Sequence, residues 1–320
     1  MNPTKKQSIL PLLTFAFALV INAHAQSFLT NGLVAYYPLN GNATDASGNG
    51  NNGVIHGALT ATDRFGISNG CFSFDGSGQY ISALADKLPV TNRTVSVWFK
   101  ANRVDNRPAI LGYGGGSCGT SFALGLNIVG YESYWLSTHC SVYTLSIPYT
   151  NPPVNAWHHW VVVTDETGTR FYLDCQFIGS RDGVTETSVA GAELGLGTIP
   201  SPGGQTPYTD GAVGYLDGFL DDVRFYNRAL STDEVQQLCA FESVPSCPAA
   251  SIRVSGSEIE VCWPSRSNQL YQVDYRSDLS TNMWLPLFTN VAGSGQTICV
   301  ADRIVYPQRF YRIVCPTNQP

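Results

Sequence analysis

Hydrophobic and polar positions alternate along most of the chain, and this pattern predicts short β-strands joined by turns. The clearest strand is 94–101 (TVSVWFKA), in which two valines and a phenylalanine occupy every second position. The clearest hairpin spans 157–179 and turns at 166–168. No segment of useful length before Ser231 has the 3.6-residue period of a helix. The pattern therefore predicts an all-β protein.

One stretch, 216–237 (LDGFLDDVRFYNRALSTDEVQQ), predicts an apolar strand, a turn and a short helix in succession. Ser231 is a suitable N-cap, and Glu234 three residues later completes a capping box. Leu230 and Val235 stand where a hydrophobic staple packs across that cap. The order of these elements marks the end of a domain, which the strand closes.

Composition divides the chain into four parts. Residues 1–25 are a predicted signal peptide, because two lysines precede an apolar run and small residues before Gln26 suit cleavage there. That run is shorter than the roughly 20 residues that span a bilayer, and no later segment is long and apolar enough. We therefore expect a secreted protein, extracellular or at the cell surface, with no transmembrane segment after cleavage. The rest comprises a large β domain at 26–239, a linker at 240–246 and a small β-sandwich module at 247–320.

The charge of the chain limits the possible partners, and its cysteines indicate whether it forms disulfides. Only 13% of the residues are charged and the formal net charge is −6, so there is no basic stripe and we expect no nucleic-acid partner. Nine cysteines in an exported chain indicate disulfides, because the sequence has no C-x-x-C pair and no Cys/His cluster with zinc spacing. Sequence alone leaves the connectivity open. By position we favour Cys118 with Cys140, Cys262 with Cys299 and Cys247 with Cys315, and we leave Cys71, Cys175 and Cys239 unassigned.

Five motifs follow one another along the first domain: LVAYYPLNGNATDASGNGNNG, FSFDGSGQYI, VSVWFKA, the hairpin WHHWVVV with FYLDCQFIG, and GFLDDVRFYNRALSTDEV. In this order they resemble the laminin-G-like, concanavalin A-like jelly-roll family of exported bacterial proteins, over about residues 32–238. Cys175 departs from the family, which usually has Gly at that hairpin turn. Trp263, Trp284 and the strand YQVDYR make the second module similar to fibronectin type III. The resemblance implies a jelly-roll sandwich followed by a small β-sandwich domain.

A polar loop and an acidic strand suggest a calcium site. The loop 40–53 holds Asp45 and several asparagines, and hard cations take six to eight oxygen ligands. The resemblance implies one structural Ca²⁺ that joins this loop to the closing strand through Asp45 and Asp221, with Asn51 and Asp222 as further candidates. Neighbouring side chains on a strand point to opposite faces, so both aspartates bind the ion only if a bulge intervenes. The alternative is a metal-free loop whose backbone is held by Asp221.

Catalytic motifs are absent from the sequence. Glycoside hydrolases of this fold need two carboxylates across a cleft, and the chain has no E-x-D-x-x-E pattern to supply them. It also lacks G-x-S-x-G. The adjacent His158 and His159 project to opposite faces of a strand, so packing with a satisfied hydrogen bond explains them. We therefore expect no enzymatic activity.

Aromatic side chains supply a candidate ligand site, because sugars lie on aromatic rings and bond to nearby polar groups. They concentrate in residues 131–149, and the candidates for ligand binding are Tyr113, Tyr131, Tyr134 and Trp135. The same rings are equally suited to packing between two sheets, and the sequence leaves both interpretations open.

The predicted function is non-catalytic binding of an extracellular glycan or glycoprotein by a Ca²⁺-stabilised jelly roll. Two alternatives remain because jelly rolls host several functions. An adhesion or scaffold protein would bind a protein partner through an exposed apolar patch. A polysaccharide hydrolase or lyase of the same fold would need a carboxylate pair that the sequence does not show.

Overall fold

The structure is a computed structural model. It describes residues 27–115, 119–128, 131–137, 145–148, 153–182, 186–201, 203–207, 214–243, 247, 250–255, 258–265, 270–278, 283–294, 296–303 and 308–315. The predicted signal peptide and the pair Cys118–Cys140 lie outside the described residues.

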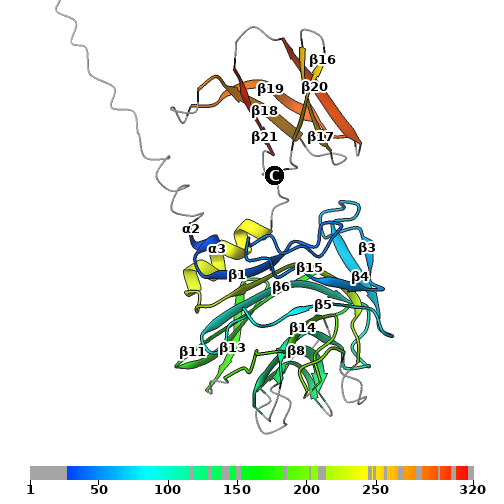
Figure 1. Cartoon of the computed structure of the whole chain (residues 1–320), viewed down its shortest axis with the longest axis vertical. Coiled ribbons are helices and arrows are strands. Elements are labelled where there is room, and N and C mark those ends of the chain that lie inside the picture. The colour runs from blue at the N-terminus through cyan, green and yellow to red at the C-terminus, as the bar shows by residue number, and fades with distance from the viewer. Residues whose placement is uncertain are drawn as a thin grey trace, which may run out of the picture.

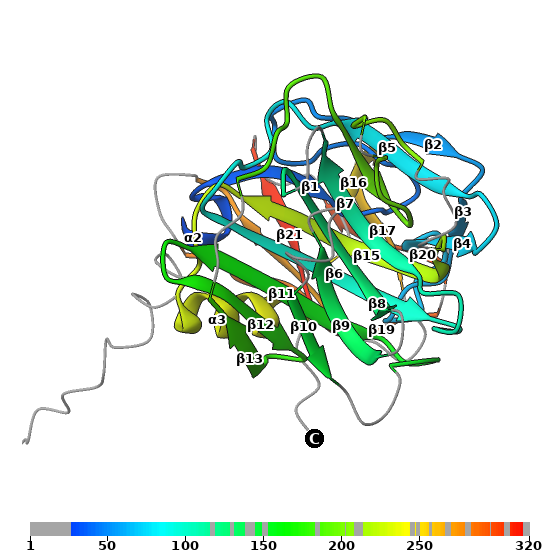
Figure 2. The same cartoon turned by 90° about the horizontal axis from the view of Figure 1, so that it is seen from below.

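Two antiparallel sheets stacked face to face build the first domain, which confirms the all-β jelly-roll prediction (Figures 1 and 2). The first sheet has the order β13-β12-β11-β6-β15-β4-β3, and β1 also pairs with β15. Its strands are β1 (Leu33–Tyr37), β3 (Leu59–Ala61), β4 (Cys71–Asp75), β6 (Arg93–Ala101), β11 (His158–Asp165), β12 (Gly168–Leu173), β13 (Gln176–Arg181) and β15 (Asp217–Tyr226).

The second sheet has the order β10-β9-β8-β7-β14-β5-β2. Its strands are β2 (Val54–His56), β5 (Tyr80–Leu84), β7 (Ala109–Gly114), β8 (Ser121–Ile128), β9 (Tyr131–Ser137), β10 (Leu145–Pro148) and β14 (Glu193–Leu196). The Gly, Pro and Thr content of the tract 195–214 predicts an exposed loop. Leu196 and Ile199 are nevertheless buried, because the chain first completes β14 and then packs on this sheet.

Alternation along the strands explains the core between the sheets. On β6 the side chains of Val95, Val97 and Phe99 are fully buried in that core, as the pattern predicts. The other face of β6 carries Ser96 and Trp98, which point to the outer side of the first sheet. The outer side is therefore partly polar, and it is this side that a helix covers.

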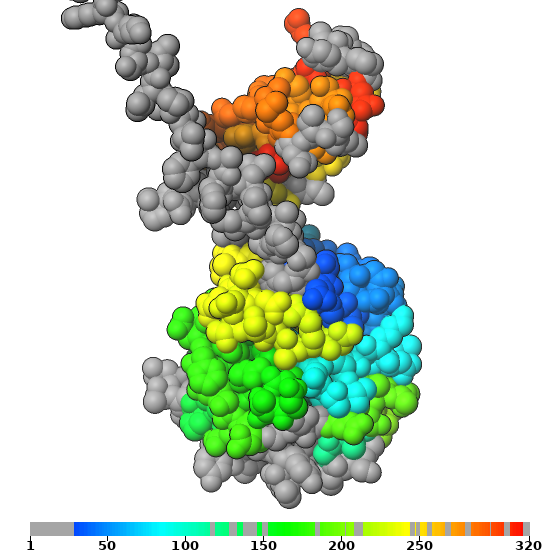
Figure 3. All heavy atoms as spheres, turned by 90° about the vertical axis from the view of Figure 1, so that its left-hand side faces the viewer, coloured from blue at the N-terminus to red at the C-terminus, as the bar shows by residue number. Residues whose placement is uncertain are grey.

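The covering helix is α3 (Thr232–Glu242), which lies over the first sheet near the short helix α2 (Ser27–Thr30) (Figure 1). Its predicted capping box between Ser231 and Glu234 is present. In Figure 3 the yellow segment that includes α3 lies on the surface of this domain beside the blue N-terminal strands. Among the described residues, neither helix has the length and apolar character needed to cross a bilayer.

Two details of the predicted boundaries change. The linker was expected to start at 240, but residues 240–242 form the last turn of α3, so the first domain extends further. The predicted hairpin at 166–168 is confirmed, yet its return strand divides into β12 and β13. Asp174 and Cys175 form a second turn there with φ values of 47° and 69°, and two positive φ values are what a two-residue hairpin turn of the primed type needs.

The second module is a small sandwich of two three-stranded sheets, with the orders β16-β17-β20 and β19-β18-β21. Its disulfides Cys262–Cys299 and Cys247–Cys315 confirm two of the three predicted pairs, whereas Cys71, Cys175 and Cys239 are free thiols. The strands are β16 (Ser251–Ser255), β17 (Glu258–Pro264), β18 (Leu270–Arg276), β19 (Leu285–Ala292), β20 (Thr297–Arg303) and β21 (Phe310–Val314).

Candidate functional site

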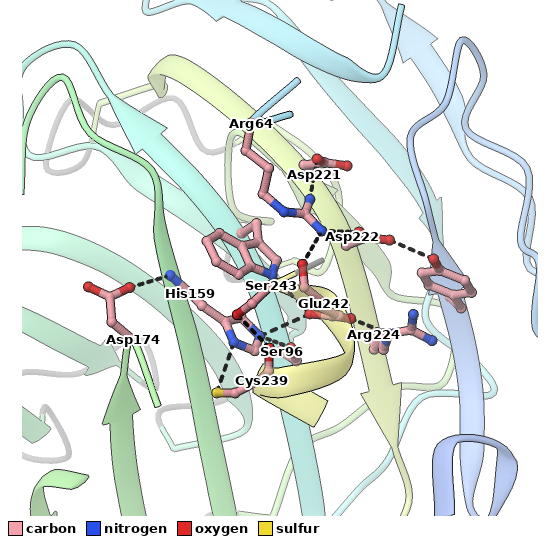
Figure 4. Close-up of polar contacts among 12 residues, drawn as sticks. Arg64, Ser96, His159, Asp174, Asp221, Asp222, Arg224, Cys239, Glu242 and Ser243 are labelled. Carbon is pink, nitrogen blue, oxygen red and sulfur yellow. Dashed lines mark hydrogen bonds and ion pairs between the residues drawn. The ribbon is translucent and has the colours of Figure 1, made fainter. Parts of the chain in front are cut away.

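A pocket of about 540 Å³ opens on the outer side of the first sheet, where β1, β15, the loop before β4 and the end of α3 meet. Apolar side chains form much of its wall: Leu29, Leu33, Phe65, Ile67 and Phe241. Polar and charged side chains also line it, among them Tyr36, Asn40, Asp63, Arg64, Asp221, Asp222, Arg224 and Glu242. Most of the charged groups belong to one hydrogen-bonded cluster, which Figure 4 shows.

Arg64 binds both aspartates of β15. Its Nη1 donates to Asp221, and its Nη2 donates to Asp222 Oδ2 at 2.6 Å (Figure 4). The register with β6 shifts between Asp221 and Arg224, and Asp222 has a φ of 44°, so β15 carries a bulge at this point. Regular strand alternation would turn the two aspartates to opposite faces unless a bulge intervened, and this bulge does turn both carboxylates toward one guanidinium.

Aromatic rings hold the Arg64 side chain in place. Its guanidinium carbon lies 4.5 Å from the ring centroid of Trp98 and 4.4 Å from that of Phe65. Its Nη2 also donates to the backbone carbonyl of Glu242 at 3.0 Å. The side chain is only 5% exposed, and a cation over aromatic faces in a desolvated site is strongly attracted. Arg64 therefore has little freedom of movement.

Glu242, the last residue of α3, occupies the centre of the cluster. Its Oε1 accepts a hydrogen bond of 2.5 Å from Arg224 Nε, and its Oε2 accepts one of 3.0 Å from Trp98 Nε1. Oε2 also lies 3.1 Å from His159 Nε2. The Glu242 side chain is 1% exposed, and a carboxylate at this depth persists only when it is paired and hydrogen-bonded. The end of α3 is thus fixed to three strands.

Burial and the neighbouring groups together shift the pKa values of the buried acidic side chains in opposite directions. Burial raises the pKa of Asp221 to about 8, and repulsion from Asp222 adds to this effect against the opposing charge of Arg64. Burial also disfavours the charge of Glu242, but the hydrogen bond from His159 and the charge of Arg224 outweigh it and lower the pKa of Glu242 to about 2. Burial and the neighbouring Asp222 carboxylate raise the pKa of Tyr36, whose hydroxyl donates to Asp222 Oδ1 at 2.5 Å.

The residues predicted to bind calcium have other partners. Asp45 Oδ1 accepts from the backbone N–H of Tyr36, and Asp45 Oδ2 accepts from that of Asn51, at 3.0 and 2.9 Å. Both aspartates of β15 face a positive charge, as described above, where a cation would need negative ligands. The set Asp45, Asn51, Asp221 and Asp222 therefore does not fit a calcium ion. Hydrogen bonds to Asp45 hold the loop against β1 instead.

The aromatic candidates for ligand binding are largely core residues. Tyr113 is fully buried and donates its hydroxyl hydrogen to the carbonyl of Pro89 at 2.8 Å. Tyr134 packs between the sheets, and Trp135 packs with Ile199 on the opposite face of the same sheet. These three rings do not form a ligand surface, because both faces of their strands are covered. The backbone of Tyr131 begins β9, but its side chain lies outside the described residues.

No sequence pattern indicates the two residues at the centre of the pocket, Arg64 and Glu242. Nothing in the pattern around Arg64 distinguishes it from the 17 other basic residues, because its two carboxylate partners are more than 150 positions away. Glu242 fell in the expected linker. The prediction that His159 is packed with satisfied hydrogen bonds is confirmed, since it is fully buried and its Nε2 lies 2.7 Å from Ser96 Oγ.

The family model described as the concanavalin A-like lectin/glucanases superfamily matches residues 75–236, half of the chain. The search of curated protein sequences gave no match.

Among solved structures, domain 4 of an extracellular arabinanase from Geobacillus stearothermophilus, in complex with arabinotriose, matches with a TM-score of 0.51 and 18% identity. That match covers 65% of this chain and 98% of the other. The ligand-binding domain of botulinum neurotoxin serotype D, in complex with N-acetylneuraminic acid, matches with a TM-score of 0.50 and 12% identity. It covers 82% of this chain and 70% of the other. At these identities the likeness shows the fold.

Replacing Glu242 with alanine should destabilise the first domain by about 3–5 kcal/mol, because it leaves the Arg224 and His159 side chains buried without their acceptor. Thermal unfolding followed by calorimetry measures this loss. Glu234→Ala is the matched control on the same helix, where a partly exposed capping residue is worth about 1 kcal/mol. Equal losses in the two variants would contradict a central role for Glu242.

Stability should fall as the pH rises from about 4 to about 8. Asp221 has a folded pKa of about 8 and an ordinary value of 3.8, so between these limits the folded protein holds a proton that the unfolded chain has lost. Melting temperatures measured across this range test the sign. Asp221→Asn should make the profile flatter, because Arg64, Asp222, Asp63 and Glu242 then face a group that does not titrate. If the slope of melting temperature against pH is unchanged in this variant, a group other than Asp221 causes the pH dependence.

Added calcium should leave the melting temperature unchanged. Protein treated with the calcium chelator EGTA and the same protein returned to millimolar calcium are compared by thermal unfolding, with about 1 mM covering weak extracellular sites. Hydrogen bonds to Asp45 already hold the loop, so no ion is needed to order it. A calcium-dependent rise in the melting temperature that Asp45→Asn abolishes would show that this loop binds calcium.

Proposed function

The chain belongs to the concanavalin A-like lectin/glucanases superfamily, and from this premise we propose that it is an exported, non-catalytic protein that binds a glycan segment in the pocket beside Arg64. The observation that carries the proposal is the pocket itself, which joins aromatic walls to fixed polar groups. Its volume of about 540 Å³ lies within the range of about 300–1,000 Å³ that is usual for small-ligand sites.

The lining suits the two kinds of surface that a sugar presents. Phe65 and Phe241 offer apolar rings, and the Phe241 side chain is 46% exposed. The amide of Asn40 and the cation of Arg64 also line the pocket as polar groups. Pyranose and furanose rings have apolar faces that pack on aromatic side chains and hydroxyl groups that bond to amides and charged groups. A short glycan segment fits both requirements at once.

The fixed position of the Arg64 side chain favours ligand binding in the pocket. The guanidinium of Arg64 is fixed by two aromatic rings, two carboxylates and one carbonyl group. A ligand that uses it does not have to order a flexible side chain, which otherwise costs about 0.5–1.5 kcal/mol. The cluster can therefore orient a ligand without first having to order a flexible side chain.

The same contacts argue for binding without catalysis. Hydrolysis of a glycosidic bond needs one carboxylic acid to protonate the leaving oxygen and a second carboxylate on the other side of the bond. Each acidic side chain of the pocket is already engaged: Asp221 and Asp222 by Arg64, Glu242 by Arg224, and Asp63 by the backbone N–H groups of Phe65 and Ile67. Acids held in this way are not free to reach a substrate.

Two structures of similar fold were solved with sugars, arabinotriose in one and N-acetylneuraminic acid in the other. They direct the first choice of ligands toward arabinan oligosaccharides and sialylated glycans. An adhesion protein that binds a protein partner is the remaining alternative, and a concave pocket of this volume favours a small ligand over it.

Phe241→Ala should weaken glycan binding about tenfold, which corresponds to about 1.4 kcal/mol for one lost ring contact. A glycan array identifies the ligand for the full chain, and calorimetric titration then gives the affinities. Phe177→Ala is the matched control, because Phe177 is 56% exposed and does not line the pocket. Failure of the protein to bind any glycan, or equal losses in both variants, would contradict the proposal.

A further inference from the structure

A second cluster lies on the other side of Glu242, and the glycan proposal makes no use of it. It contains His159 from β11, Cys175 from the turn between β12 and β13, and Cys239 from α3. The ligand atoms of these three side chains all lie within 4.8 Å of one another. No spacing in the sequence reveals the cluster, because its members come from three separate elements. The sequence prediction that there is no zinc-type Cys/His site rested on spacing alone.

The distances match the size of a tetrahedral metal site. His159 Nδ1 lies 3.3 Å from Cys239 Sγ. With metal bonds of about 2.3 Å to sulfur and about 2.0–2.1 Å to nitrogen, the two ligand atoms of a tetrahedral zinc ion stand about 3.5 Å apart. The His159–Cys239 pair therefore needs a shift of only a few tenths of an ångström to admit the ion, and Cys175, whose sulfur lies within 4.8 Å of both atoms, completes the set by a further movement of its turn.

The histidine is oriented as a metal ligand is. Its Nε2 lies 2.7 Å from Ser96 Oγ and 3.1 Å from Glu242 Oε2, so this nitrogen carries the hydrogen that Glu242 accepts (Figure 4). Its Nδ1 faces the sulfur of Cys239, and a metal ion that binds there takes the place of any hydrogen on this nitrogen. The ring also stacks on Trp98, at 4.8 Å between centroids and an interplanar angle of 3°. A carboxylate behind a histidine is the outer-shell arrangement that fixes metal-binding imidazoles.

The accessibility of the three ligands also suits a metal. His159 and Cys239 are buried on a strand and a helix, whereas Cys175 is partly exposed at its turn. An ion can enter from that side, and water can fill a fourth position. Cys175 stands at a positive φ of 69°, where Gly or Asn is the usual choice. A thiol at this costly position points to a role for its side chain.

We propose that His159, Cys175 and Cys239 bind one zinc ion, which joins the β12–β13 turn and α3 to β11. Two thiolates and an imidazole form a soft-to-borderline donor set that zinc accepts and that calcium and magnesium do not. Two thiolates also neutralise the charge of the ion, which suits a buried position. The competing state is a Cys175–Cys239 disulfide, in which neither sulfur is a thiolate that can bind a metal ion.

Cobalt titration of the full chain tests the proposal. Protein without a histidine tag is stripped of metal and titrated with Co²⁺, which reports tetrahedral sulfur ligation through a thiolate-to-metal charge-transfer band and intense visible bands. One cobalt ion should bind per chain, and zinc should displace it. Saturation with zinc at about 100 times its dissociation constant should also raise the melting temperature, by mass action on the folded state.

Three single variants assign the ligands. Cys175→Ser and Cys239→Ser should lose the charge-transfer band, whereas Cys71→Ser should keep it, because Cys71 is a free thiol outside the cluster. Far-ultraviolet circular dichroism confirms that each variant is folded, and the partly exposed Cys175 provides the variant least prone to unfolding. Cobalt binding that survives in Cys175→Ser overturns the proposal. So does a Cys175–Cys239 disulfide found by non-reducing peptide mapping of the native protein.

Discussion

The buried carboxylate of Glu242 is the contact on which the outer side of the first sheet depends. It accepts hydrogen bonds from Arg224 on β15 and Trp98 on β6, and it lies beside His159 on β11. Those three groups are satisfied only when α3 is docked, and the carboxylate is shielded from water only in the same state. Removing a buried charge from its partners costs far more than an exposed ion pair gains. Docking of the helix therefore satisfies buried polar groups on three strands of the sheet at once.

The helix covers the sheet with two kinds of surface. Near its start, Val235 and Leu238 pack on Val161 and Val163 of the sheet, and this burial supplies the hydrophobic part of the stability. At its end the contacts are charged and directional. An apolar contact alone tolerates sliding and rotation of a helix, whereas the Glu242 contacts are met in one position. The pocket lies at the charged end because the loop that carries Arg64 stands beside α3 there.

The sequence predicts the framework better than it predicts the site, and the reasons are local. The alternation in β6 and the capping box at Ser231 depend on neighbours within a few residues, and both are confirmed. The position of Asp222 depends on a bulge that no residue pattern marks. The burial of Trp135 depends on Ile199 in a tract whose Gly and Pro content predicted an exposed loop. Alternation assigns a face to each side chain, but it does not say what covers that face.

The contrast between Arg64 and a typical catalytic group explains why fixed charges favour binding. A group that transfers protons must change its charge during the reaction, and its surroundings must accept both states. Arg64 is surrounded by two carboxylates and two aromatic rings that stabilise only the cation, and Glu242 is held as the anion by Arg224. Arg64 and Glu242 therefore keep their charges when a ligand binds, whereas Asp221 beside them changes its charge near pH 8. The arrangement that stabilises the helix is thus the same one that gives the pocket a rigid polar wall.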